Sequence, residues 1–406
     1  MPPADPSGRS PLVVLFLTVF IDLMGFGIVI PLLPIYAERM HATPFTAGVL
    51  IAVYSLMQLV FAPLWGRLSD GIGRRPVLLV SLTGSAVSYL LLATASSVEM
   101  LFAARILAGV AGANIPVAQA YIADVTSSAD RARGMGLIGA AFGLGMVIGP
   151  GLGGGLSLLG PRVPECFAAG LCLANVALAA RRLPESLPST RRRPDAFRHP
   201  LSPASLRAAV TRPGAGVLFT IFFLVTLGFA ILEGTFSLAA THRYDFTAAQ
   251  VDGLWLYMGL VAIVVQGWLV GRLTRRLPER TLIATGTVAL AVGFVWIAVG
   301  AHTGGLFGAL GLVVGGQGLA GPSLSSLVSK TVETRVHGEA LGVSQALSAG
   351  ARVLGPAGGG FVFHRFDLQA TYLVAAACAA LAAGLTLLVQ RVAAHGADVV
   401  RMRRSG

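Results

Sequence analysis

The feature that most constrains this chain is a series of long apolar segments separated by short polar stretches. A helix that crosses the hydrocarbon layer of a bilayer needs about 20 apolar residues in succession. Twelve segments meet that length, and 55% of all residues are hydrophobic whereas 12% are charged. The sequence therefore predicts an all-α membrane protein with twelve transmembrane helices and no sizeable soluble domain. The expected spans are 11–36, 45–65, 77–97, 101–123, 135–158, 163–180, 215–240, 248–270, 281–301, 304–328, 339–361 and 370–390.

The basic residues predict the orientation of these spans. A formal net charge of +12 does not indicate nucleic-acid binding here, because the charges lie between the apolar segments. Cytoplasmic loops of membrane proteins carry most of the Lys and Arg residues. With a cytoplasmic N-terminus, the loops expected outside hold only Arg39, Arg162, Arg243 and Arg365. We therefore expect a multi-pass protein of the plasma (inner) membrane with both termini in the cytoplasm, and a first span that stays in the mature chain.

The chain contains an internal repeat. A shift of 206 residues aligns Gly136 with Gly342 and Pro150 with Pro356, and it also superposes glycines and a proline of spans four and ten. Six spans per repeat in parallel orientation are typical of transporters whose two bundles rock around a central site. The expected domains are a six-helix bundle at 1–186, a cytoplasmic linker at 187–213 and a second, pseudo-symmetric six-helix bundle at 214–406.

The loop between spans two and three combines glycines with paired charges. Gly66 and Gly73 favour a tight turn and close helix approach, and Asp70, Arg74 and Arg75 place charges at the cytoplasmic surface. Asp124, at the inner end of span four, is a plausible partner. We expect this cluster to act as a latch that holds one state of the transporter, whereas a loop that only sets the topology is the alternative.

Span five carries a dense series of small residues. Its glycines and one proline leave a helix face almost without side chains, so a neighbouring helix can pack very close. The prediction is a tight seam that limits leakage, with simple helix packing as the alternative. The residues are Gly145, Gly149, Pro150, Gly151, Gly153 and Gly154.

These segments resemble the signatures of one transporter family. GRLSDGIGRRPVLL at 66–79 resembles the loop signature of the major facilitator superfamily, and RILAGVAGANIPVAQAYIADVT and GLGMVIGPGLGGG resemble signatures of its 12-span drug:proton antiporters. With IDLMGFGIVIPLLP in span one and LPES after span six, the first half is similar to the tetracycline exporters. The resemblance implies the fold of that superfamily and proton-coupled efflux by alternating access.

Four charges are expected inside the membrane, where an ionisable group is costly and usually paired or functional. They are Asp22, Arg105, Glu233 and Arg352. Asp22 is about 11 residues into span one, near mid-membrane, and is the first choice for the proton carrier. Glu233 is the second choice, with pairing to Arg352 as its alternative. Arg105 matches the Arg of the span-four signature, which the resemblance links to proton transfer, and a role as a conformational lock stays open.

Several polar residues within the spans are candidates for the substrate cavity. For each of them, a hydrogen bond between helices is an equally good interpretation. They are Tyr54, Gln58, Asn114, Gln119, Gln266, Gln317, Gln345 and Arg352.

The sequence departs from the tetracycline exporters at three positions. Where they carry an acidic residue in span three and a His in span eight, this chain has Ser88 and Ala262, and the acid of span nine has no counterpart. A multidrug or metabolite exporter is therefore the better prediction, with a tetracycline-specific exporter as one alternative.

The predicted function is proton-driven export of small amphipathic drugs or metabolites. An uptake or sugar-type facilitator is a further alternative. An enzyme would need a nucleophile with its base, or a metal cluster, at one membrane depth, and neither is evident. We expect no catalytic residues, metal or cofactor. The expected partners are a small-molecule substrate, protons and the lipid bilayer, but no nucleic acid, and the expected state is a monomer.

Overall fold

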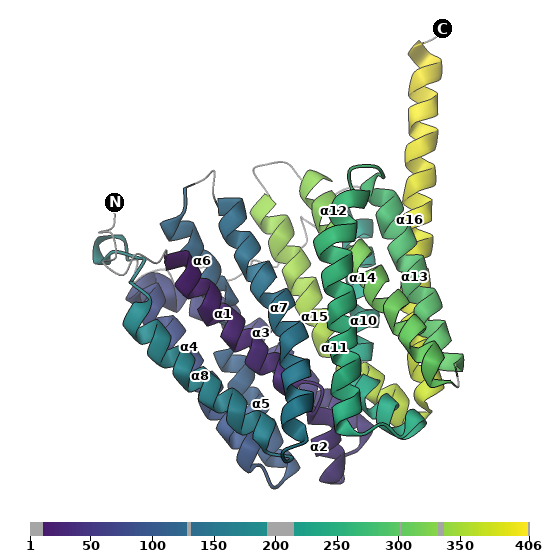
Figure 1. Cartoon of the computed structure of the whole chain (residues 1–406). Helices are drawn as coiled ribbons and strands as arrows, with labels where there is room; N and C mark the ends of the chain where they lie inside the picture. Colours follow the sequence, from purple (N-terminus) through teal and green to yellow (C-terminus); the bar gives the residue numbers. More distant parts are fainter. Residues whose placement is uncertain (1–10, 128–130, 193–214, 301, 332–336, 405–406) are drawn as a thin grey trace. The chain divides into compact units, whose positions relative to one another are not determined.

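The computed structural model describes residues 11–127, 131–192, 215–300, 302–331 and 337–404, and Figure 1 shows that these are almost entirely helical. The first half contains α1 (Pro11–Val29), α2 (Leu33–Arg39), α3 (Pro44–Ile72), α4 (Arg74–Thr94), α5 (Val98–Ala111), α6 (Ile115–Val125), α7 (Arg131–Ser157), α8 (Val163–Arg182) and the short 3-10 helix η1 (Ser189–Arg191). The second half contains α10 (Ala215–Tyr244), α11 (Ala248–Val264), the π-helix η2 (Val265–Leu269), α12 (Val270–Leu273), α13 (Glu279–Val299), α14 (Thr303–Thr331), α15 (His337–Arg365) and α16 (Leu368–Arg404).

Within the described residues, 11 helical stretches are long and apolar enough to cross a membrane. They coincide with eleven of the twelve predicted spans. The twelfth, 339–361, lies within α15, which contains Arg352 and many glycines and is not among these eleven. The prediction of an all-α, multi-pass membrane protein is confirmed, and the count of twelve holds approximately.

The chain divides into two compact units. Unit 1 comprises Met1–Pro200 and Phe236–Gly259, and unit 2 comprises Leu201–Thr235 and Leu260–Gly406. The C-terminal part of α10, from Phe236, and the N-terminal part of α11, up to Gly259, therefore belong to unit 1. The predicted boundaries at 186 and 213 stay a prediction.

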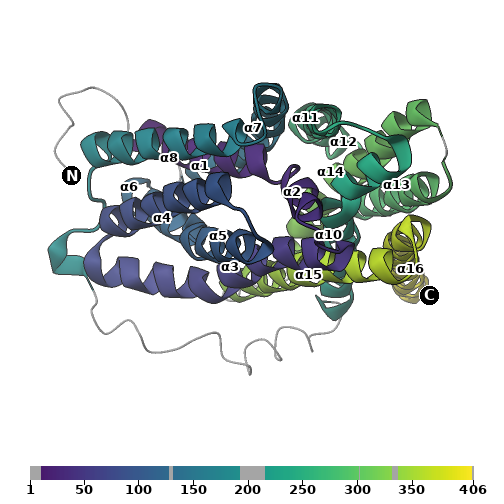
Figure 2. The same ribbon diagram turned by 90° about the horizontal axis from the view of Figure 1, so that it is seen from below.

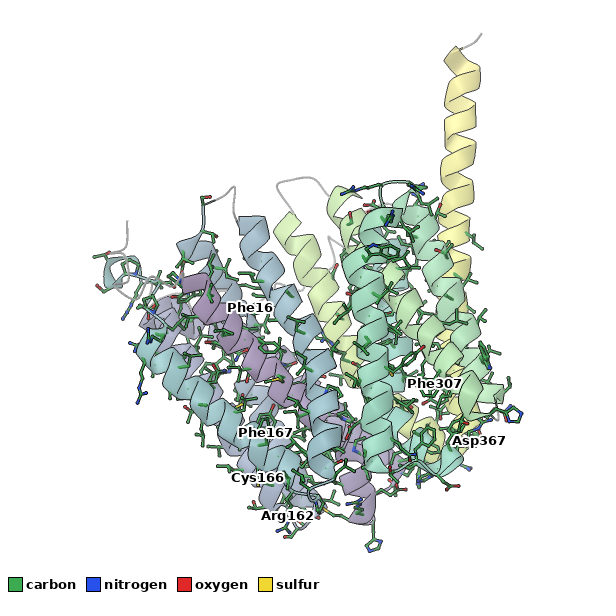
Figure 3. The ribbon with its side chains drawn as sticks, viewed as in Figure 1. Phe16, Arg162, Cys166, Phe167, Phe307 and Asp367 are labelled. Carbon is green, nitrogen blue, oxygen red and sulfur yellow. The ribbon has the colours of Figure 1, made fainter. Side chains whose placement is uncertain are left out.

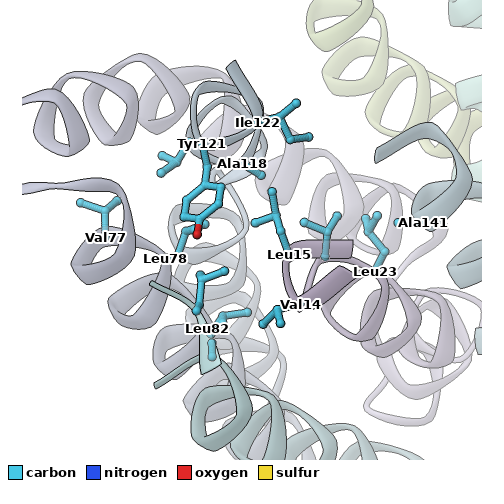
Figure 4. Close-up of a cluster of buried hydrophobic side chains, with 14 residues drawn as sticks. Val14, Leu15, Leu23, Val77, Leu78, Leu82, Ala118, Tyr121, Ile122 and Ala141 are labelled. Atoms are coloured by element: carbon cyan, nitrogen blue, oxygen red, sulfur yellow. The ribbon is translucent and has the colours of Figure 1, made fainter. Parts of the chain in front are cut away.

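Unit 1 is built around α1. This helix packs against both α7 and α8, and α4 lies beside α8 and α5 (Figure 2). Val14 and Leu15 of α1 meet Leu78 and Leu82 of α4 and Tyr121 of α6 in a buried apolar cluster (Figure 4). The Asn175 amide adds a polar link, because its Nδ2 donates to the Thr18 carbonyl at 2.8 Å.

Unit 2 repeats one of these contacts. α10 and α15 touch where an added Cβ at Gly234 would lie 2.5 Å from the Cα of Pro356. In unit 1, an added Cβ at Gly149, which precedes Pro150, would lie 2.7 Å from the Cα of Gly27 in α1. The same pair of helices therefore approaches closely in both repeats. Elsewhere in unit 2, α13 packs against α14 and α16.

The two repeats differ in where their helices break. The first and fourth predicted spans are each interrupted, between α1 and α2 and between α5 and α6, where Pro31, Pro34 and Pro116 cannot continue the ladder of backbone hydrogen bonds. In the second half, α14 is continuous through Pro322, whereas the eighth span contains the π-helix η2. Such local widening of a helix is often found at functional positions.

Candidate functional site

Asp22 lies in the middle of α1 and is held by the break in the fourth span. Asn114, in the turn between α5 and α6, donates from Nδ2 to Asp22 Oδ2 at 3.2 Å and to Ser81 Oγ at 2.8 Å. Asn114 is buried, whereas Asp22 is half-buried. The Asn114 amide therefore fixes the Asp22 carboxylate in the middle of α1, on a residue that is not fully buried.

The same break frees three backbone carbonyls at the end of α5, and side chains from neighbouring helices satisfy them. Buried backbone groups without partners are costly, so these bonds stabilise the interruption. The carbonyls of Val110, Ala111 and Gly112 accept, in that order, from Trp65 Nε1 at 2.6 Å, Ser81 Oγ at 2.6 Å and Gln58 Nε2 at 3.0 Å.

Arg105 is only 1% exposed and lies on aromatic rings. Its guanidinium carbon is 4.2 Å from the centroid of the Tyr54 ring and 5.8 Å from that of Phe26, and the two rings stack at 4.9 Å. Tyr54 Oη also accepts a hydrogen bond from Gln58. Among the described residues, no ion pair joins Arg105 to Asp22. The arrangement ties α5 to α3 and α1 by cation–π contact, a geometry that suits a conformational lock.

Arg74 is the centre of a charged cluster at the end of unit 1 where α3 meets α4. Its Nη1 lies 2.6 Å from Asp70 Oδ1 and donates to Ser69 Oγ at 2.6 Å, and its Nε donates to Asp124 Oδ2 at 3.2 Å. Ser186 also donates to that Asp124 oxygen, at 3.0 Å. The structure thus brings Asp70, Arg74 and Asp124 together, whereas the Arg75 guanidinium donates to the Ala180 carbonyl. Their role in gating stays a prediction.

Glu185 is a member of this cluster that the sequence analysis did not assign. Its two carboxylate oxygens accept from the backbone N–H groups of Arg74, at 2.9 Å, and Arg75, at 3.2 Å. A carboxylate here satisfies free donors at the start of α4 and complements the positive end of the helix dipole. Gly73 makes room for it with φ of 111°, and an added Cβ there would collide with Glu185. Gly66, by contrast, has open space around it. Glu185 is the acidic residue of LPES after span six, and that motif was the feature of the sequence that could have identified it.

The glycines of α7 lie on two faces of that helix. Gly145, Gly149 and Gly153 pack against the backbone of α1, with added Cβ atoms 2.7–2.9 Å from its atoms. On the other face, an added Cβ at Gly154 would lie 2.7 Å from Asp252 Cβ, and one at Gly151 would lie 3.1 Å from Leu256, both in α11 within unit 1. Pro150 lies inside the helix between these positions. α7 therefore has a narrow seam on each side.

The predicted charges of unit 2 are close but not directly paired. Arg352 of α15 lies near Glu233 of α10, but the ion pairs found among the described residues do not join them. Arg352 Nη2 donates to Ser348 Oγ at 3.3 Å. Glu233 and Arg352 are both half-buried.

The remaining cavity candidates differ in exposure. Gln119 on α6 and Gln266 in the π-helix are exposed, and Gln317 on α14 is half-buried. Gln266 packs against Gly318. The side chain of Gln345 lies outside the described part of the chain. Of these four residues, only Gln119 belongs to unit 1 together with Asp22, and the other three belong to unit 2.

The expectation of four membrane-embedded charges was incomplete. The structure also buries Glu165, the third residue of α8, and Asp252, the fifth residue of α11, at 1% and 0% exposure. Both belong to unit 1 and lie at its end where α8 begins, marked by Arg162 and opposite to Phe16 in Figure 3. In the predicted topology this is the outer end. Charges in the first turns of the sixth and eighth spans were the signal in the sequence.

Comparison with known proteins agrees with this geometry. Residues 15–356 match the Major Facilitator Superfamily. The class C tetracycline resistance protein of Escherichia coli is 35% identical over 351 residues, which cover 86% of this chain and 88% of that protein. Multidrug resistance protein 2 of Bacillus subtilis is 28% identical over 391 residues, which cover 93% and 94% of the two chains.

A solved structure shows the same fold. The crystal structure of the human organic anion transporter MFSD10 (TETRAN) aligns with a TM-score of 0.70 and 27% sequence identity, and the alignment covers 94% of this chain and all of the other. The match across most of the sequence and the helical fold lead to one assignment: this chain belongs to the Major Facilitator Superfamily.

Proposed function

We propose that this transporter is a proton-coupled exporter of small amphipathic drugs or metabolites that works by alternating access. The observation that carries the proposal is Asp22, a half-buried residue whose carboxylate is held in mid-span by the Asn114 amide. In this mechanism, Asp22 binds a proton when it faces the outside and releases it when it faces the cytoplasm. Substrate that enters from the cytoplasm competes with the proton for the same state, which gives antiport.

The relatives support export, and the local chemistry bears on the substrate. Tetracycline and multidrug resistance proteins are both similar to this chain. Ser88, which stands where the tetracycline exporters carry an acid, is buried and donates to the Ser85 carbonyl at 2.7 Å, so this position offers no charge to a metal-chelated drug. We therefore propose a broader class of amphipathic substrates, with tetracycline as the alternative.

The remaining parts of the proposal concern the setting. The chain acts in the plasma (inner) membrane with both termini in the cytoplasm, because basic loops remain on that side. It uses the proton gradient and no cofactor. It functions as a monomer, since one chain contains both repeats.

Proton release from inverted membrane vesicles tests the proposal. The vesicles are acidified inside, and a panel of lipophilic cations, neutral drugs and magnesium-tetracycline is added in turn. We expect one or more compounds to release protons with wild-type protein and none to do so with Asp22→Asn.

The matched control is Asp367→Asn. Asp367 is an exposed carboxylate whose Oδ1 accepts from the Ala370 N–H at the start of α16, and asparagine can replace it there. This variant should release protons like wild type. Transport without proton release by wild type would exclude antiport, and normal proton exchange by Asp22→Asn would exclude Asp22 as the carrier.

A further inference from the structure

Two buried carboxylates at the predicted outer end of unit 1 take no part in the mechanism above. Glu165 on α8 and Asp252 on α11 lie near each other, and both lie near Tyr36 of α2. Asp252 also lies against Gly154 of α7. The acidic pair therefore lies among α2, α7, α8 and α11.

All four carboxylate oxygens of this pair are buried and have no hydrogen-bond donor among the described protein groups. The Tyr36 hydroxyl lies beside Glu165, but Tyr36 Oη donates its single proton to the Pro161 carbonyl at 2.6 Å, so towards Glu165 it can only accept. The ion pairs of the described residues do not include Glu165 or Asp252 either. Two unpaired negative charges side by side in a dry site are strongly unfavourable.

Something must therefore neutralise the pair, and a proton fits the site best. A proton on either carboxyl group removes one charge and turns that group into a hydrogen-bond donor. A multivalent metal ion fits poorly, because no group of three or more His, Cys, Asp or Glu side chains in the described residues is placed to hold one.

We propose that Glu165 and Asp252 form a proton-binding site that holds the predicted outer end closed. With the proton bound, the pair stays buried among α2, α7, α8 and α11. Without it, the repulsion between the carboxylates separates the two segments until water reaches them, and the outer end opens. This inference rests on the proposed function in one respect, because it gives the proton gradient a second site to act on besides Asp22.

Other ionisable groups surround the pair, and the test must separate them from it. The Glu38 carboxylate contacts the imidazole of His242, which links α2 to the end of α10 within unit 1. α7 faces α11 with Gly151 and Gly154 near the pair and with Val147 farther along the helix. At this end of unit 1, the charged or titratable groups on the elements around the pair include Tyr36, Glu38 and Arg39 on α2, His41 after it, Arg162 before α8, Cys166 on α8, His242, Arg243 and Tyr244 on α10, and Asp245 before α11.

Electron–electron resonance between two spin labels measures the opening directly. The labels are attached at Glu38→Cys and His242→Cys in a full-length chain whose native cysteines are replaced by alanine, which also removes the Glu38–His242 contact as a source of pH dependence. We expect the short-distance population to fall when the pH is raised from mildly acidic to mildly alkaline. In Glu165→Gln/Asp252→Asn, the short distance should persist at every pH.

Asp245→Asn is the matched control, because Asp245 is an exposed carboxylate at the same end of unit 1. It should keep the pH response of the parent chain. A second readout is the infrared band of a protonated carboxyl group at neutral pH, which should be weaker in Glu165→Gln/Asp252→Asn than in the parent chain and unchanged in Asp245→Asn.

The outcomes separate this inference from the proposed function. A distance distribution that ignores pH in the parent chain, or follows pH equally in Glu165→Gln/Asp252→Asn, overturns the proton site. A distribution that follows sodium concentration at constant pH assigns the site to a metal cation instead and also overturns it. Because these measurements use no substrate, they can fail while Asp22-dependent antiport is intact, and they can succeed while antiport is absent.

Discussion

Arg74 links three separate stretches of the chain through one residue. Its guanidinium bonds Asp70 on α3 and Asp124 at the end of α6, and its backbone N–H bonds Glu185 beyond α8. Hydrogen bonds that involve a charged group contribute roughly 1.5–3 kcal/mol each. The cluster is therefore a substantial local source of stability as well as a candidate latch.

Glu185 gives the clearest residue-scale prediction. Glu185→Gln leaves one acceptor oxygen for the three backbone donors of Arg74, Arg75 and Leu187. It also removes the charge at the start of α4, so it should lower the free energy of unfolding by about 1 kcal/mol. Thermal unfolding of the purified protein in detergent measures the change. Glu99→Gln is the control, because Glu99 is exposed and Ser97 already caps α5. Equal midpoints for the two variants would contradict the capping role.

At the scale of elements, α7 and α15 show why glycine is required at some positions and not at others. An alanine Cβ at Gly149 would lie 2.7 Å from Gly27 Cα and from the Met24 carbonyl, whereas one at Gly143 would meet nothing within 4 Å. Overpacking of this kind costs about 1–3 kcal/mol. The two positions are on the same helix, so they share helix propensity but not packing.

We accordingly expect Gly149→Ala to lower the thermal unfolding midpoint and Gly143→Ala to preserve or raise it. The repeat extends the prediction to unit 2, where an added Cβ at Gly355 would lie 2.5 Å from Ala230 Cβ and one at Gly358 would meet nothing within 4 Å. Gly355→Ala should therefore destabilise and Gly358→Ala should not. If both members of either pair behaved alike, the close helix contacts would not be the reason for glycine.

The elements also show which features the sequence could predict. Apolar length predicts the spans, and the glycine spacing of span five predicts close packing. Spacing alone does not say that Gly149 faces α1 whereas Gly154 faces α11, because that depends on which helices become neighbours. The π-helix has no compositional signal. Glu165 and Asp252 were missed because a charge in the first turn of a span resembles an ordinary interfacial residue, and only the packing of α2, α7 and α11 buries it.

At the scale of the whole molecule, the predicted topology places the start of α8 outside the cell. Cys166 is exposed there, next to Arg162 (Figure 3), whereas Cys172 is buried. With Cys172 and Cys378 replaced by alanine, Cys166 should react with a membrane-impermeant maleimide in intact cells. Arg276→Cys, in a cysteine-free chain, should react only after the membrane is permeabilised. The reverse pattern would invert the topology.

The central claim is that transport is driven by exchange with protons, and transport by the purified protein in liposomes tests it most directly. A pH gradient is imposed in each direction, and the movement of a compound found in the vesicle panel is followed. The account predicts that the compound moves opposite to the proton flow, reverses when the gradient reverses, and only equilibrates when an ionophore removes the gradient. Transport at the same rate in all three conditions would contradict antiport and indicate a facilitator.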